Sequence, residues 1–405
     1  MSGWTFAKLH ELGSVERGRS RHRPRNDPAL YGGPYPFVQT GDIKAAGLRL
    51  WSYEQTYSEV GLAQSRLWPA GTLCITIAAN IGDTAILGVP ACFPDSIVGF
   101  IPRPGVSDTT FVKYLLDATK QRLTSISHGA TQDNLSLEKL LSQDLYVPPL
   151  IKQQRIAEIL EAYDDLIEVN RRRVALLEEM ARGLFEEWFV RFRFPGRDKQ
   201  DVDGELPEGW SSRPFSSLAD FNNGYAFKPA DFEQEGLPIV KIPELKGGTS
   251  TKTPRNSGSK VPERLHIDTG DLLFSWSGTL AVSEWTGGPA LLNQHLFRVL
   301  SKGEWHRGFL KESLRAALAK FDSLGVGATM KHIRRSALDT TMVAVPPAGP
   351  LQDRANRVFA SIYDQIIVIR QQAQVLTSAR DLLLPRLISG QLSVAEAELE
   401  LAQAA

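Results

Sequence analysis

The residues in this chain of 405 residues that could do binding chemistry are runs of arginine, amide and hydroxyl side chains. In the densest run, from Arg17 to Arg25, five arginines occupy every second position. Alternate side chains of an extended segment point to the same side. Such a row could hold phosphate groups, because a guanidinium binds a phosphate through two parallel hydrogen bonds. A basic loop that only faces solvent is the alternative interpretation.

Polar residues in loops form a second kind of candidate. Their side chains could hydrogen-bond the base edges of a nucleic acid, or they could cap turns, and the sequence leaves both possibilities open. In the first half of the chain the candidates are Arg19, Ser20, Arg21, Gln39, Thr40, Asn80, His128, Thr131 and Gln132. In the second half they are Tyr225, Lys241, Lys246, Ser277, Thr279, Asn293, Gln294, Thr329 and Lys331.

Catalytic motifs are missing from the sequence. It contains no phosphate-binding loop of the form G-x-x-x-x-G-K-[ST], and no G-x-G-x-x-G follows an expected strand. The seven histidines show no pair at metal-ligand spacing. A packed or hydrogen-bonded role is the simpler interpretation of His295. We therefore expect no catalytic residue, no metal site and no cofactor.

The composition predicts a globular chain. It is 42% hydrophobic and 23% charged, and its 46 basic residues balance its 46 acidic residues, which argues against nonspecific binding to polyanions. We find no signal-peptide pattern and no apolar run long enough to span a membrane. Cys74 and Cys92 are the only cysteines, so neither a disulfide framework nor a Cys-rich zinc site is expected. We expect a cytoplasmic location.

A long helix must position the loops of the first half. Apolar positions alternate in steps of four and three from Leu150 to Val190, which is the heptad pattern of a helix that packs on a partner. The predicted contact positions are Ile156, Leu160, Tyr163, Ile167, Asn170, Val174, Leu177, Ala181, Leu184 and Trp188. About 40 helical residues would extend roughly 60 Å.

The same pattern returns after Leu351 and predicts the partner helix. Its contact positions would be Leu351, Ala355, Val358, Ile362, Gln365, Ile369, Gln372, Leu376 and Ala379. Short motifs recur at a near-constant offset as well, among them Gly129-Ala130-Thr131 with Gly327-Ala328-Thr329, and Pro148-Pro149 with Pro346-Pro347. Two unrelated helices would share the period but not these motifs. We therefore predict a duplicated unit of about 200 residues.

Each duplicated unit also contains expected strands and short helices. In the first unit we expect strands at 37–43, running into a turn, at 71–77 and at 97–101, with helices at 111–123 and 135–141. In the second unit, strands are expected at 237–242, 270–276 and 293–299. The tail from Leu392 is rich in Ala and Glu and is expected to be a frayed helix.

Taken together, these motifs resemble the DNA-specificity subunits of type I restriction-modification systems. Two globular units open with Gly-Trp, at Gly3 and Gly209, close with Gly-Ala-Thr and Pro-Pro, and alternate with two long helices. The segments that carry the resemblance are 184–196, 384–390 and Asn293-Gln294-His295. The first unit departs from the pattern, because it has Asp95-Ser96-Ile97 where the family often shows a run like the one at Asn293.

The resemblance implies an α+β fold with two target-recognition domains separated by two long helices, which pack as an antiparallel coiled coil. The implied domains are 1–148 (first recognition domain), 149–192 (first helix), 193–208 (linker), 209–346 (second recognition domain), 347–391 (second helix) and 392–405 (tail).

Each recognition domain would read one half of a split site in double-stranded DNA. The helices would set the distance between the halves and would dock two methyltransferase subunits, through which restriction and motor subunits attach. S-adenosylmethionine, ATP and Mg would bind to those partner subunits only.

Three other classes compete with this interpretation. A DNA-binding regulator without an enzyme partner would leave no apolar helix face uncovered. Here more apolar residues are present than one contact line needs: Leu150, Ile151, Leu166, Leu176, Phe185, Trp188 and Phe189. A purely structural coiled coil does not explain the two globular units. An enzyme is disfavoured by the missing motifs. The presence of a copurifying methyltransferase would distinguish the first interpretation from all three.

Overall fold

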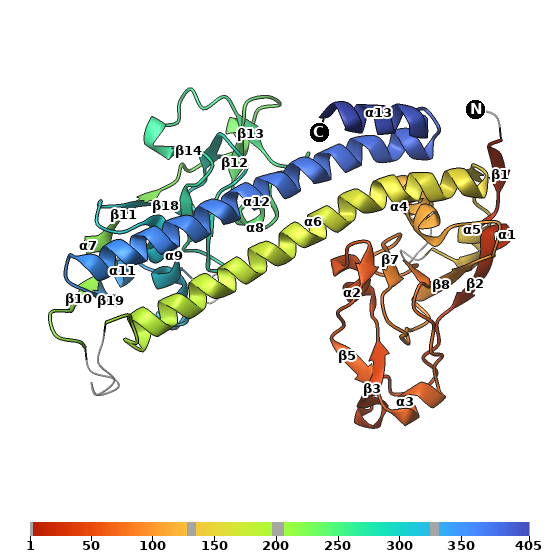
Figure 1. The fold of residues 1–405 in the computed structure, drawn as a ribbon, viewed down its shortest axis with the longest axis horizontal. Helices are drawn as coiled ribbons and strands as arrows, with labels where there is room; N and C mark the ends of the chain where they lie inside the picture. Colours follow the sequence, from red (N-terminus) through yellow and green to blue (C-terminus); the bar gives the residue numbers. More distant parts are fainter. Residues whose placement is uncertain (1–2, 128–134, 197–205, 325–331, 405) are drawn as a thin grey trace. The chain divides into compact units, whose positions relative to one another are not determined.

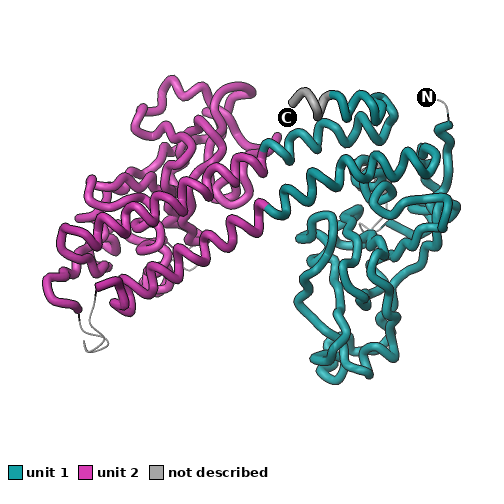
Figure 2. The backbone as a smooth tube through the Cα atoms, viewed as in Figure 1, with its two compact units in different colours: residues 1–169, 375–405 teal, residues 170–374 magenta. Residues whose placement is uncertain are grey.

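The structure is a computed structural model, and it describes residues 3–127, 135–196, 206–324 and 332–404. The chain forms two compact units, which Figure 2 shows in different colours. Unit 1 consists of residues 1–169 and 375–405, and unit 2 of residues 170–374. The boundaries fall inside the two long helices, α6 (Leu150–Phe185) and α12 (Pro350–Ile388), so each helix contributes one part to each unit (Figure 1).

Unit 1 is built on a five-stranded sheet with the strand order β2-β8-β6-β7-β4. Its strands are Gly13–Arg17 (β2), Ile97–Pro102 (β8), Leu73–Thr76 (β6), Thr84–Leu87 (β7) and Arg49–Leu50 (β4). Two short antiparallel pairs accompany the sheet: β1 (Thr5–Ala7) with β9 (Leu145–Val147), and β3 (Tyr31–Phe37) with β5 (Gln55–Tyr57). All side chains of β6 and β7 are buried, which explains their continuous apolar character.

Helices surround this sheet. The short ones are α1 (Leu9–Leu12), η1 (Pro28–Leu30), α2 (Thr40–Ala45), α3 (Glu59–Ala63) and α5 (Leu137–Leu141), and the long one is α4 (Thr109–Ser127). The first part of α6 packs here against the last part of α12. Leu160 and Leu387 are fully buried in one core, and Arg380 of α12 pairs with Asp164 of α6.

Unit 2 contains two four-stranded sheets. The first has the order β11-β18-β15-β16, with strands Ala219–Asn223, Leu296–Ser301, Leu272–Ser275 and Ala281–Glu284. The second has the order β13-β12-β17-β14, with strands Arg255–Asn256, Leu237–Val240, Ala290–Leu292 and His266–Ile267. Strands β10 (Ser211–Pro214) and β19 (Met342–Val345) form a separate antiparallel pair.

The helices of unit 2 pack on these sheets. They are α7 (Phe215–Leu218), η3 (Pro229–Asp231), α8 (Ile242–Gly247), η4 (Glu263–Leu265), α9 (Arg307–Ala316), α10 (Leu318–Ser323) and α11 (Ala337–Thr340). Here the second part of α6 pairs with the first part of α12, and Arg370 donates to Glu178 at 2.6 Å. Since Asp164 pairs with Arg380 and Glu178 with Arg370, positions rise along one helix as they fall along the other. The predicted antiparallel packing is confirmed.

The two units repeat one plan, as the sequence predicts. The order β2-β8-β6-β7 in unit 1 corresponds to β11-β18-β15-β16 in unit 2, and the pair β1-β9 corresponds to β10-β19. The shared Gly-Trp and Pro-Pro motifs meet in both units. A Cβ atom built on Gly3 would lie 3.1 Å from Cγ of Pro149, and one built on Gly209 would lie 3.5 Å from Cγ of Pro347.

The contact line predicted for α6 is confirmed, because all ten positions are buried or half-buried. In α12 the prediction is wrong at Gln365 and Gln372, which are exposed. Phe359, Tyr363 and Ile366 are fully buried instead. The cause is that α12 packs in unit 2 on the sheet side as well as on α6, so its buried band is wider than one heptad line and leaves the two glutamines outside it.

Two local predictions are also corrected. The strand expected at 37–43 ends at Phe37, and Thr40–Ala45 forms helix α2, because Asp42 accepts the backbone N–H of Gln39 and so starts a helix instead of a turn. The tail is not a frayed helix: α13 (Val394–Ala404) buries Ala397, and Glu398 pairs with Arg155 of α6. After α6, Glu186–Val190 continues as one π-helical turn.

Candidate nucleic-acid interface

The first arginines of the basic run lie on a segment that is pinned to the sheet of unit 1. The N–H of Gly18 donates to the carbonyl of Ile97 at 2.9 Å, and that of Arg19 donates to Phe93 at 3.0 Å. A side chain at position 18 would collide with the backbone, because its Cβ would lie 2.3 Å from the oxygen of Phe93. Arg21 and His22 both donate their backbone N–H to Oε1 of Gln64, at 2.5 and 3.0 Å.

Arg19 and Arg21 lie on this hydrogen-bonded backbone and directly follow Arg17, which is also exposed. The side chains of Arg19 and Arg21 are exposed, and neither forms an ion pair with a residue that the structure describes. Between them, Ser20 is buried. Free guanidinium groups on an ordered backbone suit phosphate contacts, because little further ordering is needed on binding.

Arg23 and Arg25 do not continue this row, which corrects the expectation of five arginines on one side of an extended segment. Strand β2 ends at Arg17. Arg23 turns back and donates to the carbonyls of Ser20 and His22, at 2.8 and 2.7 Å. Arg25 pairs with both carboxylate oxygens of Asp95, at 3.0 and 3.2 Å. The run therefore provides three exposed arginines that form no ion pair with a described residue, Arg17, Arg19 and Arg21, instead of five.

Three further candidates of unit 1 lie around helix α2. Gln39 precedes the helix, is exposed, and donates to Oε1 of Gln55 at 2.7 Å. Thr40 is the first residue of the helix. Asn80, in the loop between β6 and β7, accepts from Nζ of Lys44 at 3.4 Å, so this loop lies beside α2. The structure thus brings Gln39, Thr40 and Asn80 to one neighbourhood.

In unit 2, Tyr225 and the run at Asn293 meet as neighbouring backbone segments. The N–H of Tyr225 donates to the carbonyl of Leu292 at 2.8 Å, and the N–H of Gln294 donates to the carbonyl of Tyr225 at 2.9 Å. Asn293 itself is buried, and its side-chain oxygen accepts the N–H of His295 at 3.3 Å. The amide of Asn293 therefore shapes the loop that presents Gln294 and His295.

Two histidines and a tryptophan gather beside this loop. The ring of Trp276 lies 6.0 Å from that of His295 and 5.7 Å from that of His332. The pKa of His295 lies below its ordinary value, chiefly because burial disfavours the charged ring, and also because His332 and Lys241 are near. Lys241 precedes α8, and its Nζ lies 4.6 Å from the ring centre of Phe232.

The remaining candidates of unit 2 differ in exposure. Lys246, in α8, and Thr279 are exposed. Ser277 is fully buried, and its carbonyl accepts a hydrogen bond from Ser275 at 3.2 Å. The carbonyl of Thr279 accepts from the same hydroxyl at 2.9 Å. This turn holds Thr279 at the surface. The candidates His128, Thr131, Gln132, Thr329 and Lys331 lie outside the described residues.

Sequence reasoning missed several residues of this interface. Trp276 and His332 were not selected, although Trp276 aligns with Ile77 in the repeat and so stands out as a change from a core residue to a half-buried aromatic one. In unit 1, Trp51 and Tyr53 are exposed in the loop that leads into β5. The first residue of β5, Gln55, accepts a hydrogen bond from Gln39. Two aromatic residues in a polar loop were the available signal.

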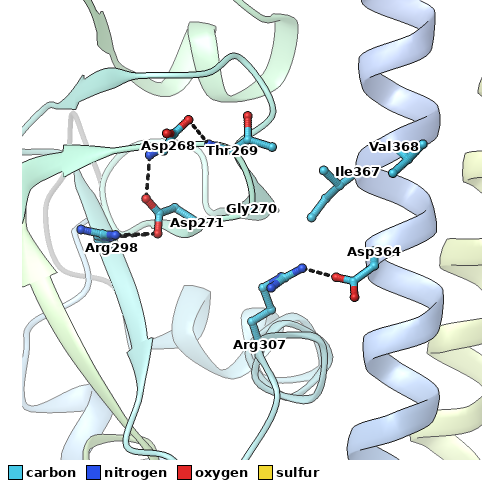
Figure 3. A pocket seen from close by; sticks show the side chains of 9 residues that line it. All are labelled: Asp268, Thr269, Gly270, Asp271, Arg298, Arg307, Asp364, Ile367 and Val368. Atoms are coloured by element: carbon cyan, nitrogen blue, oxygen red, sulfur yellow. Dashed lines mark hydrogen bonds and ion pairs between the residues drawn. The ribbon is translucent and has the colours of Figure 1, made fainter.

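An open pocket of about 510 Å³ lies in unit 2 between the turn before β15 and helix α12 (Figure 3). Two of its arginines are already neutralised: Arg298 donates to Asp271 at 2.9 Å, and Arg307 pairs with Asp364. Because both arginines are paired, neither is available to a phosphate. We therefore interpret the pocket as part of the packing interface between the sheet and helix α12. Among the described residues, no group of three or more His, Cys, Asp or Glu side chains could hold a metal ion.

The long helices keep apolar side chains that neither unit covers. On α6 these are Ile151, Leu166, Val169, Leu176 and Met180, and on α12 they are Val368, Val375 and Leu382. The expectation is wrong for Phe185, Trp188 and Phe189, which are buried in the core of unit 2. Exposed apolar residues at this density along a helix are typical of surfaces that contact other proteins. No helix among the described residues is long and apolar enough to cross a membrane.

The geometry defines a class of protein: a duplicated α+β unit whose loops carry polar and basic groups, joined by paired helices. Known proteins identify it further. A family model described as "Type I restriction modification DNA specificity domain" matches residues 1–179 and 207–378. The chain therefore belongs to the type I restriction-modification DNA specificity family, whose members supply sequence specificity within a complex.

Individual relatives agree with this assignment. The type I restriction enzyme MjaIX specificity subunit of Methanocaldococcus jannaschii is 25% identical over 97% of this chain and 94% of its own length. The EcoBI specificity subunit of Escherichia coli is 25% identical over 48% of this chain and 42% of its own length. The crystal structure of a type I S subunit from M. genitalium shares the fold, with a TM-score of 0.57 and 14% identity, over 95% of this chain and 96% of that one.

Proposed function

We propose that this chain reads a two-part DNA site, one part with each globular unit, and that its paired helices hold methyltransferase subunits. The observation that carries the proposal is the duplicated sheet order, β2-β8-β6-β7 and β11-β18-β15-β16, with different polar side chains in equivalent loops. Two globular units that share one fold but carry different side chains suit a DNA site whose two halves have different sequences.

In this proposal, residues 1–148 and 209–346 are the target-recognition domains. Arg19 and Arg21 contact phosphates, because their guanidinium groups are exposed and lack an ion-pair partner among the described residues. The polar groups around α2 would contact the half-site of unit 1, and those around α8 the half-site of unit 2. Phosphate contacts would fix the position of each unit, and contacts to base edges would select the sequence.

The exposed apolar residues of the long helices support the partner assignment. They occur on the part of α6 in unit 1, as Leu166 and Val169, and on its part in unit 2, as Leu176 and Met180. A duplicated chain offers two such surfaces, which suits two methyltransferase subunits. Restriction and motor subunits would then join through the methyltransferases.

The chain has no catalytic role in this proposal. S-adenosylmethionine, ATP and Mg would bind only to the partner subunits, and the complex would work on DNA in the cytoplasm. The missing phosphate-binding and methyl-donor motifs support this division of labour. Methylation of DNA by the pure chain with S-adenosylmethionine would contradict it.

The decisive experiment expresses the chain with the methyltransferase subunit of its own system. We expect the two proteins to purify together, and sequencing of modified bases to reveal one two-part methylated site. Replacing residues 209–346 with the equivalent unit of a relative should change one half of the site and leave the other. A chain that binds a specific DNA sequence but never a methyltransferase would be a stand-alone regulator, and the proposal would be wrong.

A further inference from the structure

Equivalent hydrogen bonds align the two units residue by residue around the candidate interface. Gly18 donates to Ile97 in unit 1 as Gly224 donates to Leu296 in unit 2, at 2.9 and 3.1 Å. The next residues, Arg19 and Tyr225, are therefore equivalent. A Cβ atom at Gly224 would lie 2.3 Å from a backbone oxygen, as at Gly18, so both segments lie equally close to the sheet.

Two more bonds extend the alignment across the sheet. The N–H of Ile77 donates to the carbonyl of Ser96 at 3.0 Å, and that of Trp276 donates to His295 at 3.4 Å. Ser96 is thus equivalent to His295, and Ile77 to Trp276. The sequence comparison, which paired Ile97 with His295, is wrong by one residue at this point.

The short helices supply the fourth pair. The backbone N–H of Gln39 donates to Asp42 at 2.8 Å at the start of α2, and that of Lys241 donates to Glu244 at 3.1 Å at the start of α8. Gln39 and Lys241 therefore occupy the same position.

At these four backbone positions, unit 1 has Arg19, Gln39, Ile77 and Ser96, and unit 2 has Tyr225, Lys241, Trp276 and His295. The backbone contacts are alike, whereas the size, charge and hydrogen-bonding groups of the side chains differ at every position. A shared frame with variable side chains is what two readers of different sequences require.

Two histidines of unit 2, His295 and His332, turn the same ring nitrogen inward. Nδ1 of His295 and Nδ1 of His332 are both buried and lack a hydrogen-bond partner. Nε2 of each ring is not among the buried unpaired atoms, and it makes no hydrogen bond to a described residue. The Nε2 edge of both rings is therefore the accessible one.

This orientation selects one tautomer. A buried N–H without an acceptor is rarer and more costly than a buried lone pair without a donor. Each neutral ring is therefore best protonated at Nε2, so that it presents an N–H donor at its accessible edge. The ring of Trp276 packs near both histidine rings and so limits their orientations.

We propose that His295 and His332 read hydrogen-bond acceptors on base edges in the half-site of unit 2, with Tyr225 and Lys241 contacting the same half-site. Acceptors of this kind in the major groove are N7 and O6 of guanine, N7 of adenine and O4 of thymine. Unit 1 uses Arg19, Gln39 and Ser96 at the equivalent positions. The inference rests on the proposed function, because it names the residues through which one recognition domain selects its bases.

The test uses the assembled complex with its methyltransferase subunits and a DNA library with both half-sites randomised. His295→Phe keeps a ring that packs on Trp276 and removes the donor, whereas His295→Gln keeps an N–H near the position of Nε2. We expect His295→Phe to lower discrimination at one base position of one half-site about tenfold, His295→Gln to restore part of it, and the other half-site to stay unchanged. His332→Phe should relax a different position of the same half-site.

The control is His306→Asn, which changes a half-buried histidine of the same unit outside this cluster and should leave both half-sites unchanged. If both phenylalanine variants keep the wild-type sequence preference, the inference is wrong while the proposed function stands. The same conclusion follows if the variants bind all DNA sequences more weakly by the same factor. If the wild-type complex shows no two-part site, the proposed function fails, and this inference with it. Thermal unfolding of each variant shows whether it is folded, and His295→Gln keeps the test open if His295→Phe is not.

Discussion

At the scale of single residues, His306 links the stability of unit 2 to pH. Its Nδ1 accepts the backbone N–H of Gly308 at 3.1 Å and so caps helix α9. An acceptor must be unprotonated. Burial, and next to it the charge of Arg307, lowers the pKa of His306 below its ordinary value of about 6.5. The cap is therefore intact at neutral pH.

Protonation of His306 should weaken the fold as the pH falls. Since the pKa is lower in the folded state, the unfolded chain binds more protons below about pH 6.5, and the free energy of unfolding therefore falls as the pH is lowered through this range. We expect His306→Asn, which keeps an acceptor and does not titrate, to flatten the pH dependence of unfolding between pH 7.5 and 5. His306→Ala should cost about 1 kcal/mol at pH 7.5. Urea unfolding at both pH values measures this, and an unchanged pH dependence in His306→Asn would contradict it.

A second residue-scale prediction concerns Arg19 and Arg21 of unit 1. Replacing Arg19 and Arg21 together with Ala should weaken binding to all DNA sequences. It should also lower the slope of log K against log salt by about two, since each phosphate contact contributes about 0.9. Arg25→Ala is the matched control, because its guanidinium already pairs with Asp95 and its loss should change the slope less. DNA-binding titrations at several salt concentrations measure the slope for each variant. An altered sequence preference at an unchanged slope would indicate that Arg19 and Arg21 read bases instead of contacting phosphates.

The sequence predicted residue types better than residue neighbourhoods. Arg19, Gln39, Asn80 and Gln294 could be selected because arginines and amides in loops are local features. The cluster of Trp276, His295 and His332 could not, since it depends on strand pairing between segments far apart in the chain. The pairing of Arg25 with Asp95, 70 residues away, removed one predicted phosphate contact for the same reason.

At the scale of elements, a hydrogen bond between a tyrosine and a carboxylate joins each unit to a long helix. In unit 1 the long helix carries the carboxylate, whereas in unit 2 it carries the tyrosine. In unit 1, Tyr114 of α4 donates to Asp164 of α6 at 2.6 Å. In unit 2, Tyr363 of α12 donates to Glu312 of α9. Burial raises the pKa of both hydroxyls, and the neighbouring carboxylates raise it further, so both remain donors at any physiological pH. The bond fixes the helix to the unit in each repeat.

The helix pair itself can be tested with two leucines of α12. Leu387 is fully buried in the core of unit 1, whereas Leu382 is 69% exposed. Leu387→Ala should destabilise unit 1 by about 2–5 kcal/mol through lost burial and the cavity left behind. Leu382→Ala should change stability by less than about 0.5 kcal/mol, and binding of the methyltransferase should weaken instead. Denaturant unfolding and a pull-down measure the two effects; similar losses of stability in both variants would show that the burial pattern is wrong.

The long helices were the elements most open to prediction. Their period extends over many turns, and the repeat supplied each with a second example. The contact line predicted for α12 was wrong at Gln365 and Gln372. Heptad spacing describes the contact of one helix with another, whereas α12 also packs against the sheet side of unit 2. Short helices such as α2 and α8 depend on single caps, Asp42 and Glu244, and these are weak signals in a sequence.

At the scale of the whole molecule, α6 and α12 are the two segments that pass from one unit into the other. Inserting four residues into each, after Glu168 and after Gln374, adds about 6 Å of helix. One DNA turn of about 10 base pairs measures about 34 Å, so the gap between the half-sites should grow by nearly two base pairs. Both half-sites should keep their sequences, because neither globular unit is changed. Mapping of methylated sites measures the gap; the same gap in the variant would show that the helices do not set it.

During synthesis, unit 1 is begun first but unit 2 is completed first. Unit 2 is one continuous stretch, residues 170–374, whereas unit 1 also needs residues 375–405. At about 5–20 residues per second, roughly 10–40 s separate the synthesis of α6 from that of its partner segment. During that time Ile156 and Leu160 lack the cover that Leu383 and Leu387 later provide. The nascent chain therefore carries an uncovered apolar face until residues 375–405 have emerged, and during that time this face is open to other apolar surfaces.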